Sequence, residues 1–314
     1  MNKPTFDPGL TQKFTHSLRR AIRQDGSFNV IRRGTNWRDI HPYLYLINVS
    51  WTAFFGIILS AFFALNLLFA IAYMLIGVEH LHGAESPYAY GRFLNAFFFS
   101  SQSLTTVGYG SISPFGIPAN AIAALEGFVG VMGFAVGTGL LVGRVSRPSA
   151  RIGFSKQVLI APYQDATALQ FRVVNRRSNT LMEISAQVLA MTVEDVDGRA
   201  ERRYLRLTLE RPGILFFPLT WTVVHPIDRD SPLYGKTAAD FARLQMEFLI
   251  LLKGTDDTFG QVVHQRFSYR YDEVVWGASF APAFDVDEHG NMVLEIDRLS
   301  ALAAGSGGRV GTSY

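Results

Sequence analysis

The chain has 314 residues, a formal net charge of +3 and a hydrophobic content of 48%, and it contains no cysteine. The lack of cysteine excludes a disulfide-stapled extracellular module and any thiolate metal or redox site. Charge is nearly absent between Asp39 and Glu79 and again over residues 93–125, whereas the second half is rich in charge. The sequence therefore predicts a membrane part followed by a soluble part.

The first 34 residues are polar, with lysine and arginine interspersed among glycine and asparagine, and they show no sustained apolar period. We expect residues 1–34 to form a flexible N-terminal segment. Their order does not match that of a signal peptide, so we expect the first hydrophobic segment to remain in the mature protein.

Residues 35–47 predict a short amphipathic helix at the membrane surface. Asn36 is placed to cap its start. Apolar side chains recur at helical spacing at Trp37, Ile40, Leu44 and Ile47. The alternative is a simple extension of the following helix, which Pro42 disfavours because proline interrupts helical hydrogen bonding.

The membrane part, residues 48–148, begins with an uncharged segment that is longer than a bilayer requires. This segment, residues 49–78, predicts an outer transmembrane helix. Trp51 near its start and Tyr73 near its end are suited to the two membrane interfaces.

A second apolar segment, residues 118–146, predicts an inner helix rich in glycine, which permits close helix contacts and, where unsupported, bending. Gly130 and Gly139 are candidate hinges. The interior carboxylate of Glu126 is a candidate functional group, because ionisable side chains are costly inside a membrane. It either supports the neighbouring loop or binds an ion, and the first interpretation is favoured by its position early in the helix.

Residues 92–110 lie between the two spans and predict a re-entrant helix with a backbone-lined loop. Residues 93–103 are apolar but too short to span a membrane. The loop that follows reads Thr-Thr-Val-Gly-Tyr-Gly over residues 105–110. Its glycines allow the backbone to alternate in hand, so that successive carbonyls face one axis and replace the hydration shell of K⁺. The candidate filter residues are Thr106, Val107, Gly108, Tyr109 and Gly110, the first four as K⁺ ligands and Thr106 also through its hydroxyl.

One chain supplies one such loop, whereas a filter with carbonyls on all sides requires four, so the sequence predicts a homotetramer. Eight lysines and arginines precede the outer helix, a basic cluster follows the inner helix, and only Arg92 lies between them. By the positive-inside rule, both termini are expected to be cytoplasmic.

Residues 149–301 change to short alternating segments separated by glycine, proline, asparagine and aspartate, which predict an all-β sandwich. The expected strands lie within residues 169–173, 184–193, 205–209, 221–224, 246–252, 262–269 and 293–296. Only residues 237–244 have a helical pattern. Residues 302–314 are expected to form a flexible tail.

Four motifs outside the filter point to one family: the run from His225 to Gly235, residues 273–277 with Ser268-Tyr269, Arg147-Pro148, and residues 37–39. On these residues the chain resembles the inwardly rectifying potassium channels, in particular the prokaryotic ones. The resemblance implies a tetramer in the bacterial inner membrane, with an immunoglobulin-like cytoplasmic assembly that extends the ion path.

Three positions depart from the pattern of that family. Many relatives carry a glutamate four residues before the filter threonine, where this chain has Gln102, and an acid just after the filter, where it has Ser111. Gln102 is a neutral candidate for filter support. Phe134 lies where strong rectifiers carry the acid that holds polyamines or Mg²⁺, so we expect weak block by these cations.

The cytoplasmic end of the inner helix is the expected gate. Phe134, Thr138, Leu141 and Val142 form a pore-facing stripe, and apolar rings close pores by dewetting. The basic residues near this end are candidates for contact with anionic lipid. They are Arg38, Arg144, Arg147, Arg151 and Lys156.

Two other functions remain open from the sequence. One is a poorly selective cation channel, whose filter is loosened by the missing acidic support. The other is a membrane-anchored binding module with a vestigial pore, which an intact filter sequence disfavours. No spacing typical of an enzyme stands out, and we expect neither a cofactor, apart from K⁺ as the permeant ion, nor a nucleic-acid partner.

Overall fold

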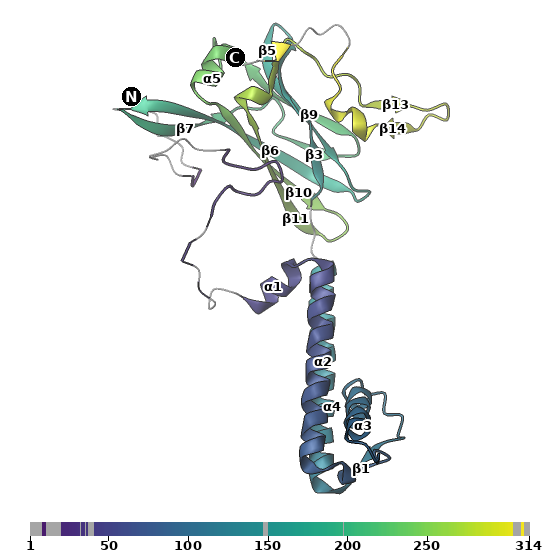
Figure 1. Cartoon of the computed structure of the whole chain (residues 1–314). Coiled ribbons are helices and arrows are strands. Elements are labelled where there is room, and N and C mark those ends of the chain that lie inside the picture. Colours follow the sequence, from purple (N-terminus) through teal and green to yellow (C-terminus); the bar gives the residue numbers. More distant parts are fainter. Residues whose placement is uncertain are drawn as a thin grey trace. The chain divides into compact units, whose positions relative to one another are not determined.

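The structure is a computed structural model that describes residues 8–10, 20–31, 33–34, 36, 41–146, 150–196, 198–303 and 309–310 (Figure 1). It divides into two compact units. One comprises residues 33–147, and the other comprises residues 1–32 with residues 148–314. The predicted division into a helical membrane part and a β-rich soluble part is confirmed.

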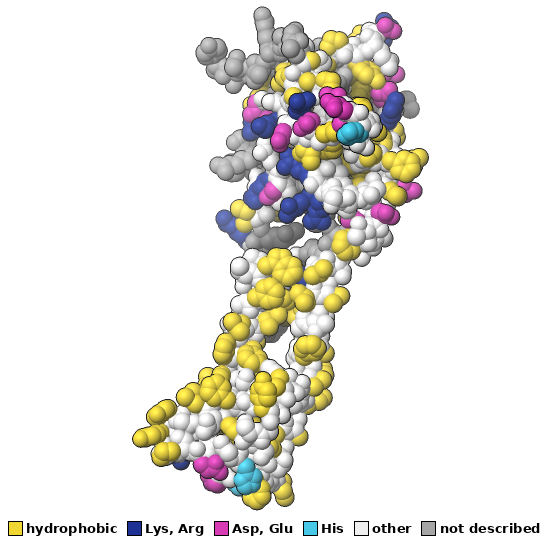
Figure 2. All heavy atoms as spheres, turned by 90° about the vertical axis from the view of Figure 1, so that its right-hand side faces the viewer, with side chains coloured by type: hydrophobic (Ala, Val, Ile, Leu, Met, Phe, Trp, Pro, Cys, Tyr) yellow, Lys and Arg dark blue, Asp and Glu magenta, His cyan; other side chains and the backbone are white. Residues whose placement is uncertain are grey.

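Two long helices form the membrane unit: α2 (Trp51–Ile76) and α4 (Gly116–Val145). Both are long and apolar enough to cross a membrane. They run side by side, and the shorter helix α3 (Ala89–Leu104) packs against both (Figure 1). Hydrophobic side chains spread over the face of this unit shown in Figure 2. Such a surface suits lipid rather than water.

Helix α1 (Pro42–Asn48) is the described part of the expected surface helix. It begins at Pro42, later than predicted, and His41 before it is extended. Proline suits this first helical position because the missing N–H would have no intrahelical partner there. Residues 35 and 37–40 of the predicted helix lie outside the described residues.

The loops at the other end of the two long helices are tied together. A 3₁₀ turn, η2 (Val78–His80), leads into β1 (Leu81–His82), which pairs with β2 (Ser113–Pro114) just after the predicted filter. Gly83 has a φ of +82°, and a Cβ there would lie 2.3 Å from the Ser111 carbonyl oxygen. Only glycine allows the loop before α3 to approach the loop after the filter this closely.

The soluble unit is a β-sandwich. One sheet has the order β11 (Gln261–Arg270), β10 (Glu247–Asp256), β6 (Leu181–Val196) and β7 (Arg199–Leu207), with β8 (Gly213–Phe216) also on β6. The other has the order β15 (Arg309–Val310), β12 (Val274–Trp276), β4 (Val158–Tyr163), β5 (Ala166–Asn175) and β3 (Ile152–Phe154), with β9 (Thr220–Ile227) on β5. Their facing apolar side chains make one core. A separate hairpin joins β13 (Phe284–Val286) to β14 (Met292–Leu294).

Strand β4 escaped prediction because its first four residues are all buried, so its sequence is a continuous apolar run without alternation. The predicted helix near residue 240 is α5 (Ala238–Arg243). Thr237 and Asp240 form a reciprocal capping box at its start, and these hydrogen bonds hold the pKa of Asp240 at about 2.

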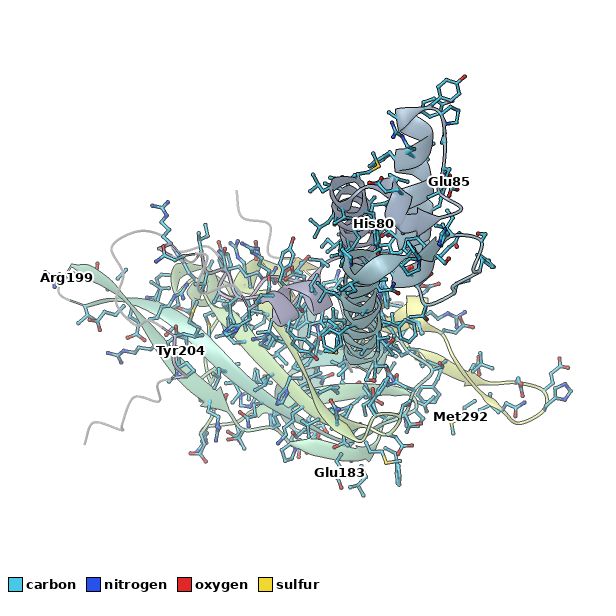
Figure 3. All side chains as sticks on the ribbon, turned by 90° about the horizontal axis from the view of Figure 1, so that it is seen from below. His80, Glu85, Glu183, Arg199, Tyr204 and Met292 are labelled. Carbon is cyan, nitrogen blue, oxygen red and sulfur yellow. The ribbon has the colours of Figure 1, made fainter. Side chains whose placement is uncertain are left out.

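The sequence predicted a flexible N-terminal segment, but residues 20–22 are held on the sandwich. The backbone amides of Ala21 and Ile22 donate to the buried Glu247 carboxylate, and Arg20 pairs with Glu273. Ile22 is buried against a small cluster on the β6–β7–β10 surface, which includes Tyr204. Figure 3 shows Tyr204 on β7, inward of Arg199 near the end of the strand.

These contacts join residues about 225 to 250 positions apart, a separation at which local sequence patterns carry no information. The C-terminal tail was also expected to be flexible, but Leu302 forms an antiparallel β-bridge with Phe280, and β15 pairs with β12.

His225 is buried in the sandwich as a neutral imidazole. Its Nδ1 donates to the Thr208 carbonyl oxygen at 2.6 Å, and its Nε2 accepts from the Ser231 hydroxyl at 2.8 Å. Burial lowers the pKa of His225 below its ordinary value of 6.5, because the imidazolium is poorly solvated there.

We expect the unfolding temperature of the full-length protein to fall as pH drops below about 6.5. Below about pH 6.5 the unfolded chain binds a proton at His225 that the folded chain does not. The contribution of neutral His225 to the free energy of unfolding is therefore complete above this pH and is lost as the pH falls below it. The slope is at most about 1.4 kcal/mol per pH unit. Thermal unfolding of the parent and of His225→Gln between pH 7.5 and 5 measures it. Equal slopes in both proteins would contradict the expectation.

Candidate ion pathway

Helix α3 ends where the predicted filter begins, and α4 holds this end in place. A Cβ on Gly130 of α4 would lie 2.1 Å from the Leu104 carbonyl oxygen. Gly130 thus packs the inner helix closely against the end of α3, for which only glycine leaves room. Helix α4 is continuous through both predicted hinges, Gly130 and Gly139, and bending at either position stays a prediction.

The filter backbone alternates in hand. Thr106, Gly108 and Gly110 have φ values of +61°, +56° and +80°, whereas Val107 and Tyr109 between them do not have positive φ. Alternation of this kind turns successive peptide groups toward the same side. The sequence predicted the unusual backbone at the two glycines but not at Thr106, because a β-branched residue rarely adopts positive φ.

The main chain of Gln102 supports the start of this loop. Its carbonyl oxygen accepts hydrogen bonds from the amides of Val107, at 2.9 Å, and Gly108, at 3.3 Å. The sequence suggested support through the Gln102 side chain. The main-chain contact was not predicted, since any residue type supplies a carbonyl and the sequence carries no signal for it.

A buried polar network joins the helices α2, α3 and α4. The carboxylate of Glu126 in α4 accepts from the Tyr73 hydroxyl of α2 at 2.7 Å and lies within hydrogen-bonding distance of the Ser100 hydroxyl of α3. Ser100 also lies 3.1 Å from Asn66 Oδ1, so its single hydrogen serves one acceptor at a time. All four residues are buried. A structural role for Glu126 is therefore favoured over ion binding.

The network corrects the prediction for Tyr73, which is fully buried rather than placed at a membrane interface. The available signal was the pair Asn66 and Tyr73, seven residues apart and thus on one face of a helix that is otherwise apolar.

We expect Glu126→Ala to weaken the tetramer and the filter, because it leaves the Tyr73 hydroxyl without its acceptor in an apolar interior, whereas Ser100 retains Asn66. Each unpaired group costs about 1–3 kcal/mol. The measurement is the dissociation temperature of the detergent-solubilised tetramer. In a cycle with Tyr73→Phe, the double variant should lose less than the sum of the single variants. Additive losses would contradict a direct interaction.

The predicted cavity and gate residues share one stripe of α4. Phe134, Thr138, Leu141 and Val142 follow helical spacing, and all four are exposed in the single chain. Phe134 has 79% of its surface exposed. Val107 and Tyr109 of the filter loop are also exposed, at 54% and 78%. Apolar side chains at these positions are available for packing against other subunits or for lining a pore.

The candidate lipid contacts do not form one set in the structure. Arg144 is engaged within the protein, where it donates to the carbonyl oxygens of Leu46 and Val49. Arg151 and Lys156 are exposed at the start of the sandwich unit. Arg38 and Arg147 lie outside the described residues.

Comparison with known proteins assigns the family. Residues 152–304 match the model of the inward rectifier potassium channel C-terminal domain, and residues 60–147 match the ion channel model. The chain is 35% identical over 288 residues to the inward rectifier potassium channel Kirbac3.1 of Paramagnetospirillum magnetotacticum. The alignment covers 90% of this chain and 96% of Kirbac3.1. The chain belongs to the inward rectifier potassium channel family. The function predicted from its filter sequence is confirmed at this level.

Mammalian inward rectifiers are more distant. Inward rectifier potassium channel 4 of Mus musculus is 29% identical, covering 81% of this chain and 62% of its own length. ATP-sensitive inward rectifier potassium channel 14 of Homo sapiens is also 29% identical, in an alignment that covers 84% of this chain and 65% of that protein. This inward rectifier is an ion channel rather than an enzyme, and channels of its family are tetramers with two transmembrane helices and a β-sandwich C-terminal domain.

Proposed function

We propose that this inward rectifier conducts K⁺ through a filter made by the carbonyl oxygens of Thr106, Val107, Gly108 and Tyr109 from four identical chains. The observation that carries the proposal is the alternating positive φ at Thr106, Gly108 and Gly110, directly after a helix that is too short to span a membrane. A stack of backbone carbonyls replaces the water around K⁺ without any charged side chain.

The test is flux through purified protein reconstituted in liposomes. Reversal potentials measured with K⁺ on one side and Na⁺ on the other should report strong K⁺ selectivity. A poorly selective cation channel, the alternative raised by Gln102 and Ser111 in place of acidic residues, would give a reversal potential near zero.

We further propose that the chain lies in the bacterial inner membrane with both termini in the cytoplasm. Support comes from the basic residues before α2 and after α4, against only Arg92 in the connecting loops of the described membrane unit. The filter then opens to the outside, and the stripe from Phe134 to Val142 faces the cytoplasmic half of the pore.

The gate is assigned to Leu141 and Val142 at the cytoplasmic end of α4. Both are apolar and exposed in the single chain, and four copies of each make a ring that excludes water and ions. Gly139, where a Cβ would meet nothing within 4 Å, remains the candidate hinge. Val142→Asp should raise K⁺ flux by wetting this ring. Unchanged flux in a tetrameric variant would move the gate elsewhere.

Anionic lipid is proposed to modulate the channel through Arg151 and Lys156, together with Arg38 and Arg147. Each basic residue near an anionic surface contributes about 1 kcal/mol of attraction. Flux in liposomes of graded anionic-lipid content should depend less on lipid in Arg151→Gln with Lys156→Gln than in the parent. The same lipid dependence in both would reduce these residues to markers of membrane orientation.

A further inference from the structure

The hairpin of β13 and β14 exposes apolar side chains on the soluble unit. Within the described residues, these two strands pair only with each other. Between 40% and 63% of the surface is exposed in each of its residues Phe284, Val286, Met292 and Val293. A two-stranded hairpin by itself is marginally stable in water. The hairpin therefore needs a cover that the described part of one chain does not supply.

The same hairpin is strongly acidic. Residues 284–297 contain five aspartates and glutamates and neither lysine nor arginine. Asp287 serves the turn, where the side chain and the amide of Asn291 donate to its carboxylate and hold its pKa below the ordinary value. Asp285 and Glu288 are exposed. An anionic leaflet repels a surface of this charge, so lipid is an unsuitable cover.

A second exposed apolar patch lies on the N-terminal segment and consists of Phe28, Val30 and Ile31. The exposed fractions of these side chains are 40%, 60% and 79%. The guanidinium of Arg266 in β11 stacks on Phe28, with its central carbon 4.6 Å from the ring centre. A Cβ on Gly26 would lie 2.7 Å from the Arg266 carbonyl oxygen. The sandwich therefore holds this N-terminal patch in place.

The hairpin and the N-terminal patch have opposite charge and lie on opposite sides of the soluble unit. Residues 20–33 contain four arginines and one aspartate. The N-terminal segment packs beside Tyr204 through Ile22. Figure 3 shows Tyr204 and Met292 on opposite sides of the sandwich. Each chain therefore holds its two apolar surfaces apart.

We propose that the β13–β14 hairpin of each subunit packs on the N-terminal patch of the neighbouring subunit. The proposal rests on the homotetramer of the proposed function. A closed ring of identical subunits is built from heterologous contacts, in which one surface of each subunit meets a different surface of the next. The two surfaces meet this requirement, because apolar side chains face apolar ones and acidic residues face arginines.

The test is disulfide cross-linking in the full-length tetramer. The chain has no cysteine, so Ile31→Cys combined with Met292→Cys provides one reporting pair. After oxidation of the tetramer isolated by size-exclusion chromatography, we expect covalent species up to the tetramer on a denaturing gel. Joint expression of the two single variants should give covalent dimers, because each cross-link joins two chains. The matched control is Ile31→Cys with Phe216→Cys, since Phe216 on β8 is also apolar and 69% exposed and should give monomers only.

Charge reversal tests the complementarity. Asp285→Arg with Glu288→Arg should slow cross-linking between positions 31 and 292 by about tenfold or more, because like charges then face each other. Adding Arg23→Glu should restore part of the rate.

Three results would overturn the proposal: monomers only from an intact tetramer, equal cross-linking in the Phe216→Cys control, or a rate that charge reversal leaves unchanged. The K⁺ selectivity of the same tetramer tests the filter without reference to this contact, so failure of the contact is distinguishable from failure of the proposed function.

Discussion

Gly108→Ala should abolish K⁺ flux while leaving a folded tetramer. Gly108 has a φ of +56°, and an added Cβ would meet no atom within 4 Å in the single chain. The defect therefore arises from the backbone, because a left-handed conformation costs an L-residue roughly 1–2 kcal/mol. Four copies around one axis add this cost at the place where the carbonyl oxygens must stay aligned.

The measurement is K⁺ flux in liposomes, with size-exclusion chromatography to establish the tetramer. Gly127→Ala in α4 is the matched control, since a Cβ there also meets nothing within 4 Å and its φ is ordinary for a helix. Flux should persist in Gly127→Ala. If Gly108→Ala conducts like the parent, the filter assignment is wrong.

Phe134→Asp should strengthen block by cytoplasmic Mg²⁺ or spermine by about a hundredfold or more. Phe134 is the most exposed of the three apolar residues in the cavity stripe, and it supplies no charge to a pore that four subunits enclose. Four carboxylates in such a cavity each attract a multivalent cation, by about 1 kcal/mol even when fully hydrated and by more where water is scarce.

Phe134→Asn separates charge from volume, because it removes the ring without adding a carboxylate. Block should rise in Phe134→Asp and stay weak in Phe134→Asn when current is recorded against graded blocker concentrations. Equal block in the two variants would place the blocking site elsewhere along the ion path.

Some elements of this channel were predictable because their evidence is local. The outer and inner helices appear as long apolar runs, α3 as an apolar run too short to span, and strands such as β10 and β11 through alternation. The filter is also local, since six consecutive residues specify it. The predicted bounds differ from the observed ones by a few residues, because helix ends depend on caps, such as Ser50 before α2.

The class of this protein, the order of its elements and its filter motif could be predicted from the amino-acid sequence, because each depends on neighbouring residues. The contacts of Glu126 with Tyr73 and Ser100, of Gly130 with Leu104, and of Arg144 with α1 became evident only in the folded chain. The packing of residues 20–22 on the sandwich also became evident only there. These contacts join residues 26 or more positions apart, and their partners become neighbours only when burial of apolar surface brings the helices and sheets together.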